Sequence, residues 1–305
     1  MLSFCLAALM ATAPADTTEL PFYPAPISHV EVGGRALAVH DSGGGGEPVV
    51  LIHGLGTNLA FWRETIPALE AAGHRAIALD LPGYGLSDKD AVSGTMADFA
   101  SAVAGTMDAL GLRQSDVVGL SMGGQIALTL ALEHPDRVRK LALLSPAGIE
   151  TFTDAEAAAL KGLVTAQAVQ NTPPAQAALN TAANFHAYDE ARDGWILTQR
   201  EALAERDDFP EYAAANAASV AGMLDGRVFD RLGEITAPTL VLYGAGDALI
   251  PNRYLHPALT TEAVADAARE ALPNATVEMI PEAGHLIMLE QPEAVNARLA
   301  AFLSE

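Results

Sequence analysis

The chain has 305 residues, of which 50% are hydrophobic and 18% are charged, a composition typical of a globular protein rather than a disordered one. Its 17 Lys and Arg against 38 Asp and Glu give a formal net charge of −21. A surface this acidic repels phosphate backbones and anionic lipid, which disfavours nucleic acid as a partner. The body of the chain has no run of 18 apolar residues, so the sequence predicts no membrane span.

Residues 1–15 resemble a secretory signal peptide. A short apolar run, Leu2 to Met10, is followed by Ala13-Pro14-Ala15, which places small residues at the spacing that a signal peptidase reads. The pattern predicts a periplasmic or secreted protein. Because the segment has no Lys or Arg, a tail on a cytoplasmic protein is the alternative. Cys5, the only cysteine, lies in this segment, so the mature chain would have no disulfide and no cysteine nucleophile.

Short apolar runs then alternate with helical patterns. Residues 29–40 predict a hairpin around Gly33-Gly34. Continuous apolar runs, typical of strands buried on both faces, occur at 49–52, 76–81, 116–120, 141–144, 239–243 and 276–280. Helical patterns occur at 96–110, 125–134, 262–272 and 292–303. This alternation predicts an α/β fold, a mostly parallel, doubly wound sheet with helices on both faces.

One segment breaks the alternation. Residues 149–235 contain no convincing buried strand and carry Ala-rich helical patterns instead. A helical insertion between two strands of a parallel sheet lies over the carboxyl ends of the strands, where ligands bind. We therefore expect a core of residues 28–148 and 236–305, with a helical cap formed by residues 149–235.

A serine between glycines is the first candidate for chemistry. The sequence Gly119-Leu120-Ser121-Met122-Gly123 follows an apolar strand and opens an apolar helix. Glycines remove the side chains that would collide in a tight strand-to-helix turn, so the hydroxyl can stand clear of the sheet. The structural alternative is a serine that caps the following helix. As a nucleophile at neutral pH, a hydroxyl is weak and needs a base.

Two further side chains come directly after predicted buried strands. His285 follows one strand and a short turn, and Asp247 closes another. An acid that accepts a hydrogen bond from the base fixes the tautomer of the imidazole and stabilises its charged form. Ser121, Asp247 and His285 are therefore predicted to act as nucleophile, acid and base. Asp154, early in the predicted cap, is the alternative acid.

The loop His53-Gly54-Leu55-Gly56 follows another predicted strand. We expect the backbone N–H groups of Leu55 and Met122 to form an oxyanion hole, and His53 to bond the loop backbone; removing one such donor typically raises a barrier by about 3 kcal/mol. Apolar side chains beside the motifs predict a pocket for a small or medium apolar substrate. Its aromatic candidates, each of which could instead belong to the core, are Phe61, Trp62, Phe152 and Trp195.

The motifs together carry a resemblance. HGLG at residue 53, DLPGYGLSD at 80, GLSMGG at 119, GAGD at 244 and GHLIMLEQP at 284 closely resemble the α/β-hydrolase fold family. Because the candidate nucleophile is Ser and not Asp, the sequence is similar to capped esterases, lactonases, proline iminopeptidase-type aminopeptidases and C–C bond hydrolases. It does not resemble the epoxide hydrolase or haloalkane dehalogenase branches.

The resemblance implies a serine hydrolase that cleaves a carboxylic ester of a small-molecule substrate through an acyl-enzyme, with no metal or organic cofactor. A C–C bond hydrolase, or a cofactor-free perhydrolase or haloperoxidase, uses the same triad and is the alternative. A noncatalytic ligand-binding protein on this fold is a third hypothesis, because a fold alone does not prove activity.

Overall fold

The computed structural model describes residues 20–90 and 92–305, so the predicted signal peptide lies outside the described residues. An eight-stranded sheet with the order β1-β2-β4-β3-β5-β6-β7-β8 forms its centre. Strands β3 to β8 run parallel, whereas β2 is antiparallel to both of its neighbours. The strands are β1 (Ile27–Val32), β2 (Arg35–Asp41), β3 (Pro48–Ile52), β4 (Arg75–Leu79), β5 (Ser115–Leu120), β6 (Val138–Leu144), β7 (Thr239–Gly244) and β8 (Ala275–Ile280).

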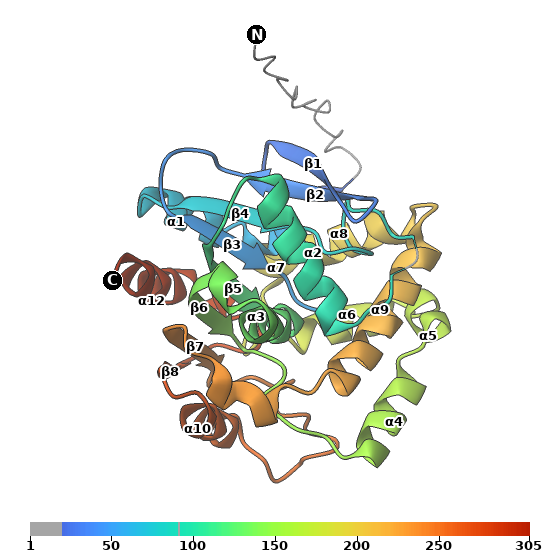
Figure 1. The fold of residues 1–305 in the computed structure, drawn as a ribbon. Coiled ribbons are helices and arrows are strands. Elements are labelled where there is room, and N and C mark those ends of the chain that lie inside the picture. Colours follow the sequence, from blue (N-terminus) through green and yellow to red (C-terminus); the bar gives the residue numbers. More distant parts are fainter. Residues whose placement is uncertain (1–19, 91) are drawn as a thin grey trace.

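Helices cover both faces of the sheet (Figure 1), which confirms the predicted fold class. Successive residues of a strand point to opposite faces. In β3, Val50 and Ile52 belong to the core under α2, α3 and α10, whereas Val49 and Leu51 belong to the core under α1, α11 and α12. The bounds are α1 (Thr65–Ala71), α2 (Met96–Ala109), α3 (Met122–Glu133), α10 (Thr261–Ala271), α11 (Ile287–Glu290) and α12 (Pro292–Ser304), with short 3-10 helices at η2 (Leu59–Trp62) and η3 (Pro135–Arg137).

The chain between β6 and β7 is helical, and we call residues 149–235 the helical insertion. It lies beside the sheet and its helices in Figure 1. Its elements are α4 (Asp154–Leu163), α5 (Ala166–Gln170), α6 (Pro174–Ala182), α7 (Glu190–Asp193), α8 (Trp195–Ala204), α9 (Phe209–Asp225) and η4 (Phe229–Glu234). None of the helices in the described part of the chain combines the length and the apolar character needed to cross a bilayer.

Helix α9 packs closely on the core. A Cβ atom on Gly222 would overlap the carbonyl oxygen of Gly94, so the helix backbone directly contacts the loop before α2. The Tyr84 hydroxyl donates a hydrogen bond of 2.8 Å to Ser219 Oγ, and both groups are buried. Gln125 of α3 donates to two carbonyl oxygens at the end of α9. Polar bonds and direct backbone contact therefore fix α9 to the core.

The order of the strands also locates the site. The chain moves from β3 to β4 in one direction across the sheet and then returns to place β5 on the other side of β3. Ligands bind at such a switch point, outside the carboxyl ends of the strands. The loops that leave β3 and β5 begin at His53 and Ser121. The topology therefore brings two of the sequence motifs to the expected binding edge.

Candidate active site

Ser121 occupies a strained turn between β5 and α3. Its φ is +52° and its ψ is −116°, a conformation that a residue with a side chain seldom adopts. A Cβ atom on Gly119 would overlap Gly123 O, and one on Gly123 would overlap Ile52 O. Glycines are thus required on both sides of the turn. Ser121 makes no side-chain hydrogen bond to the helix that follows, so the structure does not support the capping interpretation.

His285 and Asp247 form a buried pair beyond the carboxyl ends of β8 and β7. Nδ1 of His285 lies 2.8 Å from Oδ2 of Asp247, and the two side chains are 6% and 0% exposed. The other carboxylate oxygen accepts hydrogen bonds from the N–H groups of Leu249 and Ile250, at 2.8 and 3.1 Å. With Nδ1 as the donor to Asp247, a neutral His285 has its free lone pair on Nε2, as a general base needs.

The three predicted triad residues therefore follow β5, β7 and β8, at the carboxyl ends of parallel strands of one sheet. In the described structure the hydroxyl of Ser121 makes no hydrogen bond to a protein group. The alternative acid, Asp154, is the first residue of α4, and its side chain is 95% exposed and paired with Arg227. The structure thus brings His285 together with Asp247 and leaves Asp154 in an exposed ion pair.

The loop after β3 lies directly beside Ser121. A Cβ atom on Gly54 would lie 3.3 Å from Ser121 Cβ, which is closer than most such contacts. The backbone N–H groups of Leu55 and Met122 donate to no acceptor among the residues that the structure describes. Met122 is the first residue of α3, where N–H groups have no partner within the helix and carry partial positive charge. Both amides are free to bind a developing negative charge.

His53 holds this loop. The ring is buried; Nδ1 lies 2.9 Å from Gly54 O, and Nε2 accepts from the N–H of Leu81 at 3.0 Å. Burial lowers the pKa of His53 to about 4. The hydrogen bond to Gly54 has the opposite, smaller effect on this pKa. The ring is neutral at physiological pH, and both of its nitrogens bond backbone. His53 therefore has a structural role in the loop.

Asp80, the first residue of the DLPGYGLSD motif, fixes the segments around this loop. Its buried carboxylate accepts hydrogen bonds from the N–H groups of Leu59 and Leu86, each at 2.8 Å, and from the Tyr23 hydroxyl at 2.9 Å. Burial raises the pKa of Asp80 to about 6, although these bonds lower it.

Across residues 20–90 and 92–305, no group of three His, Cys, Asp or Glu side chains is placed to hold a metal ion.

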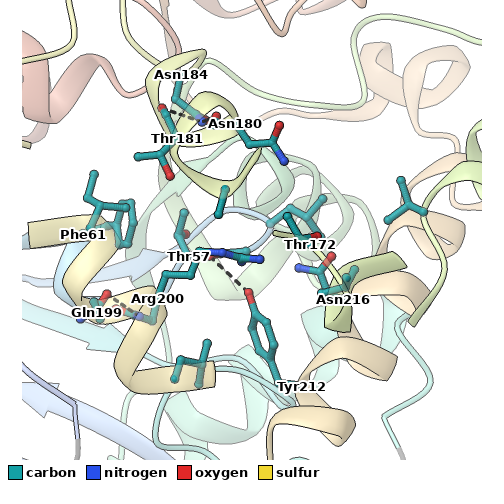
Figure 2. Close-up of a pocket in the computed structure, with 18 of the residues that line it drawn as sticks. Thr57, Phe61, Thr172, Asn180, Thr181, Asn184, Gln199, Arg200, Tyr212 and Asn216 are labelled. Atoms are coloured by element: carbon teal, nitrogen blue, oxygen red, sulfur yellow. Dashed lines mark hydrogen bonds between the residues drawn. The ribbon is translucent and has the colours of Figure 1, made fainter. Parts of the chain in front are cut away.

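A cavity of about 390 Å³ lies between the loop after β3 and the helical insertion (Figure 2). Leu55 of the loop after β3 and Leu286, the neighbour of His285, both line it, whereas Ser121, Asp247 and His285 are not among its lining residues. Most of the lining is apolar or uncharged. The polar side chains are Thr57, Asn58, Thr172, Asn180, Thr181, Asn184, Gln199, Arg200, Tyr212 and Asn216.

Arg200 of α8 is the single formally charged side chain in this lining. Figure 2 shows it reaching into the cavity. No hydrogen bond or ion pair joins it to another residue of the described chain. By contrast, neighbouring Gln199 bonds both Asn58 and the carbonyl oxygen of Pro21. The cavity therefore presents one unpaired cation in a protein with a net charge of −21. Sequence reasoning missed Arg200, since no motif surrounds it.

A family model described as alpha/beta hydrolase fold matches residues 47–292 of this chain. The chain belongs to the α/β-hydrolase fold family. It is 32% identical over 284 residues to the 2-hydroxy-6-oxononadienedioate/2-hydroxy-6-oxononatrienedioate hydrolase of Paraburkholderia phymatum, covering 90% of this chain and 93% of that protein. It is also 34% identical over 287 residues to the dihydrolipoyllysine-residue acetyltransferase component of the acetoin cleaving system of Pseudomonas putida, covering 92% and 70%.

Among solved structures, this α/β hydrolase is similar to a thermophilic esterase from Thermogutta terrifontis. The TM-score is 0.75 at 26% identity, and the match covers 92% of this chain and 98% of the esterase. These comparisons confirm the family that the sequence motifs predicted. The named activities of the relatives differ, so family membership alone leaves the bond that is cleaved open.

The aromatic residues predicted to line the pocket of this α/β hydrolase lie in different places. Phe61 lines the cavity. Trp62 is completely buried in the core beneath α1 and α12. Phe152 stacks on His256, with ring centroids 5.2 Å apart, and the ring of Trp195 packs against that of Phe61, with centroids 5.1 Å apart. These last three are absent from the cavity lining. Their apolar surfaces pack against protein instead.

Proposed function

We propose that this protein hydrolyses a carbon–carbon bond next to a ketone, in a substrate that also carries a carboxylate. The observation that carries the proposal is Arg200, the one charged side chain in the lining of a cavity that Leu55 and Leu286 also line. An unpaired guanidinium matches a carboxylate in charge and in geometry. The relative from Paraburkholderia phymatum supports this choice, because its named substrate is a dicarboxylate with a ketone. That substrate contains no ester bond, so its hydrolysis must break a carbon–carbon bond.

The first half of the proposed reaction forms an acyl-enzyme. His285 Nε2 takes the proton of Ser121 as its oxygen bonds the ketone carbon. The ketone oxygen becomes negatively charged and is held by the N–H groups of Leu55 and Met122. The carbon–carbon bond then breaks. Its electron pair leaves on a carbon conjugated to a second carbonyl group, which a 2-hydroxydienoate supplies in its 2-oxo tautomer, and His285 returns the proton to that carbon.

The second half releases the acyl group. His285 takes a proton from water, the hydroxide adds to the acyl carbon, and Ser121 leaves with that proton. One water is consumed. The products are a carboxylic acid, formed from the attacked ketone carbon, and the fragment that keeps the second carbonyl group. Asp247 stabilises the charged imidazole in both halves through its hydrogen bond to Nδ1. Arg200 binds the substrate carboxylate from the lining of the cavity.

Ester hydrolysis, which the sequence analysis placed first, is the second candidate. It uses the same triad with an alkoxide as the leaving group. The similarity to the Thermogutta terrifontis esterase and the apolar part of the cavity lining favour it. The unpaired Arg200 and the named substrate of the Paraburkholderia phymatum relative favour the carbon–carbon bond.

The test compares two substrates on one enzyme. The purified protein is assayed with 2-hydroxy-6-oxo-6-phenylhexa-2,4-dienoate, whose loss of visible colour reports cleavage, and with p-nitrophenyl esters of graded acyl length. We expect kcat/KM for the dienoate to exceed that for every ester at least about tenfold, and Ser121→Ala to abolish both activities. The opposite order would assign ester hydrolysis. Absence of both activities, with no labelling of Ser121 by a fluorophosphonate, would exclude a serine hydrolase.

A further inference from the structure

A buried carboxylate outside the triad connects the helical insertion to the turn that carries His285. Glu290 is the last residue of α11 and is 7% exposed. Its Oε2 accepts hydrogen bonds from the backbone N–H groups of Gly284 at 2.7 Å and His186 at 3.0 Å. Its Oε1 accepts from the N–H of Ala187 at 2.6 Å. One side chain thus binds backbone from two segments about 100 residues apart.

The same two segments also bond each other directly. The carbonyl oxygen of Asn184 accepts the N–H of His285 at 2.7 Å and that of Leu286 at 3.2 Å. Both segments lie outside helices and strands. Their buried N–H groups therefore cannot form the regular backbone hydrogen bonds of a helix or sheet and need other acceptors. Four hydrogen bonds therefore link residues 184–187 to residues 284–286 and Glu290, and a fifth joins Glu290 to Gly284. Glu290 receives three of the five.

Close packing at His186 extends the link to the acid of the triad. A Cβ atom on Gly284 would lie 2.5 Å from the backbone nitrogen of His186. A Cβ atom on Gly246 would overlap the His186 ring. Gly284 precedes His285 and Gly246 precedes Asp247, so His186 contacts the turns of both residues. Residues 184–187 thus lie directly on the His285–Asp247 pair.

We infer that Glu290 is a positioning residue, which fixes residues 184–187 and the turn of His285 as one unit. Asn184 and Leu286 both line the cavity. The cavity wall and the base are therefore set relative to each other by the same hydrogen bonds. Bonds to a charged acceptor are stronger than bonds between neutral groups, which suits a junction without regular secondary structure. The consequence for catalysis rests on the proposed role of His285 as the base.

Glu290→Gln is the sharpest variant, because it keeps the shape and replaces one oxygen by an NH2 group. In either orientation of the amide, at least one backbone N–H then faces a donor. Asp116→Asn is the matched control. Asp116 is also a buried carboxylate, but it lies near the start of β5 and bonds Arg139 near the start of β6, at the opposite ends of the strands from the candidate site.

Hydrogen exchange measured by NMR tests the contact itself. In Glu290→Gln we expect the amides of His186, Ala187 and Gly284 to exchange at least about tenfold faster than in the wild type, with no comparable change in Asp116→Asn. This readout needs no activity. Protection of all three amides within threefold of the wild type would overturn the inference even if the proposed function is correct.

Kinetics test the effect on His285. Active sites are counted by complete fluorophosphonate labelling, so that misfolded protein is excluded from kcat. Per labelled site, we expect Glu290→Gln to lower kcat at least about tenfold and to slow labelling similarly, while KM changes less than threefold because Arg200 is untouched. Equal losses in Asp116→Asn would show a general effect of destabilisation and overturn the inference. If Glu290→Gln does not fold, Glu290→Asp, which keeps both oxygens, is expected to show smaller changes in the same direction, and wild-type values for it would overturn the inference.

Discussion

The Nδ1 atom of His285 lies 2.8 Å from Oδ2 of Asp247, whose side chain is fully buried. In Asp247→Asn, the amide oxygen would keep the bonds from the N–H groups of Leu249 and Ile250, so the NH2 group would face the imidazole. That arrangement selects the tautomer with its proton on Nε2, which cannot accept a proton from Ser121. We expect kcat to fall about 10³- to 10⁴-fold in steady-state assays, with the fold retained by circular dichroism.

The exposed acid Asp154 provides the control for this prediction. Asp154→Asn removes only an ion pair with Arg227 at the surface. We expect kcat and KM within about twofold of the wild type, because exposed ion pairs contribute little. A large loss in Asp154→Asn together with a small loss in Asp247→Asn would transfer the role of the acid to Asp154.

The turn at Ser121 predicts a steric effect. In Gly123→Ala the new methyl group would overlap Ile52 O and press on His53 O, and both atoms are backbone. We expect the free energy of unfolding to fall by about 1–3 kcal/mol, and labelling of Ser121 to slow, as measured by urea unfolding and fluorophosphonate kinetics. Gly45→Ala, where the methyl group would meet open space, is the control. Similar stabilities for the two variants would contradict the close backbone packing around Gly123.

Arg200 predicts a selective effect on charged substrates. Arg200→Gln removes the positive charge of the cavity and leaves a shorter, neutral polar side chain. Because a hydrogen bond to a charged group contributes about 1.5–3 kcal/mol, kcat/KM for a carboxylate-bearing dienoate should fall about 10- to 100-fold. The value for neutral p-nitrophenyl butyrate should change less than about threefold. Equal losses for both substrates would indicate a structural role for Arg200.

Asp80 predicts a slope of stability against pH. Burial raises its pKa to about 6 in the folded protein, compared with an ordinary value of about 3.9. Between about pH 3.9 and 6 the folded state therefore binds more protons at Asp80 than the unfolded chain does. The contribution of Asp80 to the free energy of unfolding falls as pH rises through this range, by on the order of 3 kcal/mol.

The measurement is urea unfolding of the wild type and of Asp80→Asn from pH 4 to 7. The wild-type stability minus that of the variant should decrease across this range. Taking the difference matters because the lowered pKa of His53 makes its own contribution rise with pH, and this contribution is present in both proteins. A difference that stays flat or rises would contradict a raised pKa for Asp80.

The sheet and the order of the motifs were predictable because local patterns encode them. Apolar runs such as Val49 to Ile52 are typical of strands covered on both faces, and the structure places that run in β3. Ser121 and Asp247 could be found because each follows such a run within three residues. The run before His285 was predicted to be buried on both faces, but β8 is an edge strand and only Ile280 in it is fully buried. The start of α3 was predicted three residues late, because the helix begins directly after the strained Ser121 turn.

The cavity was not predictable in the same way. Its lining joins helices of the insertion with the loop after β3, and their packing depends on contacts across 100 residues or more. Arg200 looks in sequence like Arg192 or Arg206, whose carboxylate partners become visible only in the structure. Trp62 and Phe61 are adjacent and similarly apolar, yet one packs in the core and the other faces the cavity.

The backbone contact between α9 and the loop before α2 has a consequence for how a substrate enters. With Gly222 against Gly94, this helix has no room to slide or tilt without separating main chains. Helices α4, α5 and α6 bury only Ala157, Ala177 and Thr181 between them. We therefore expect substrate to enter through movement of α4, α5 and α6, while α9 keeps its position on the core. The backbone amides of α4–α6 should accordingly exchange hydrogen faster than those of α9.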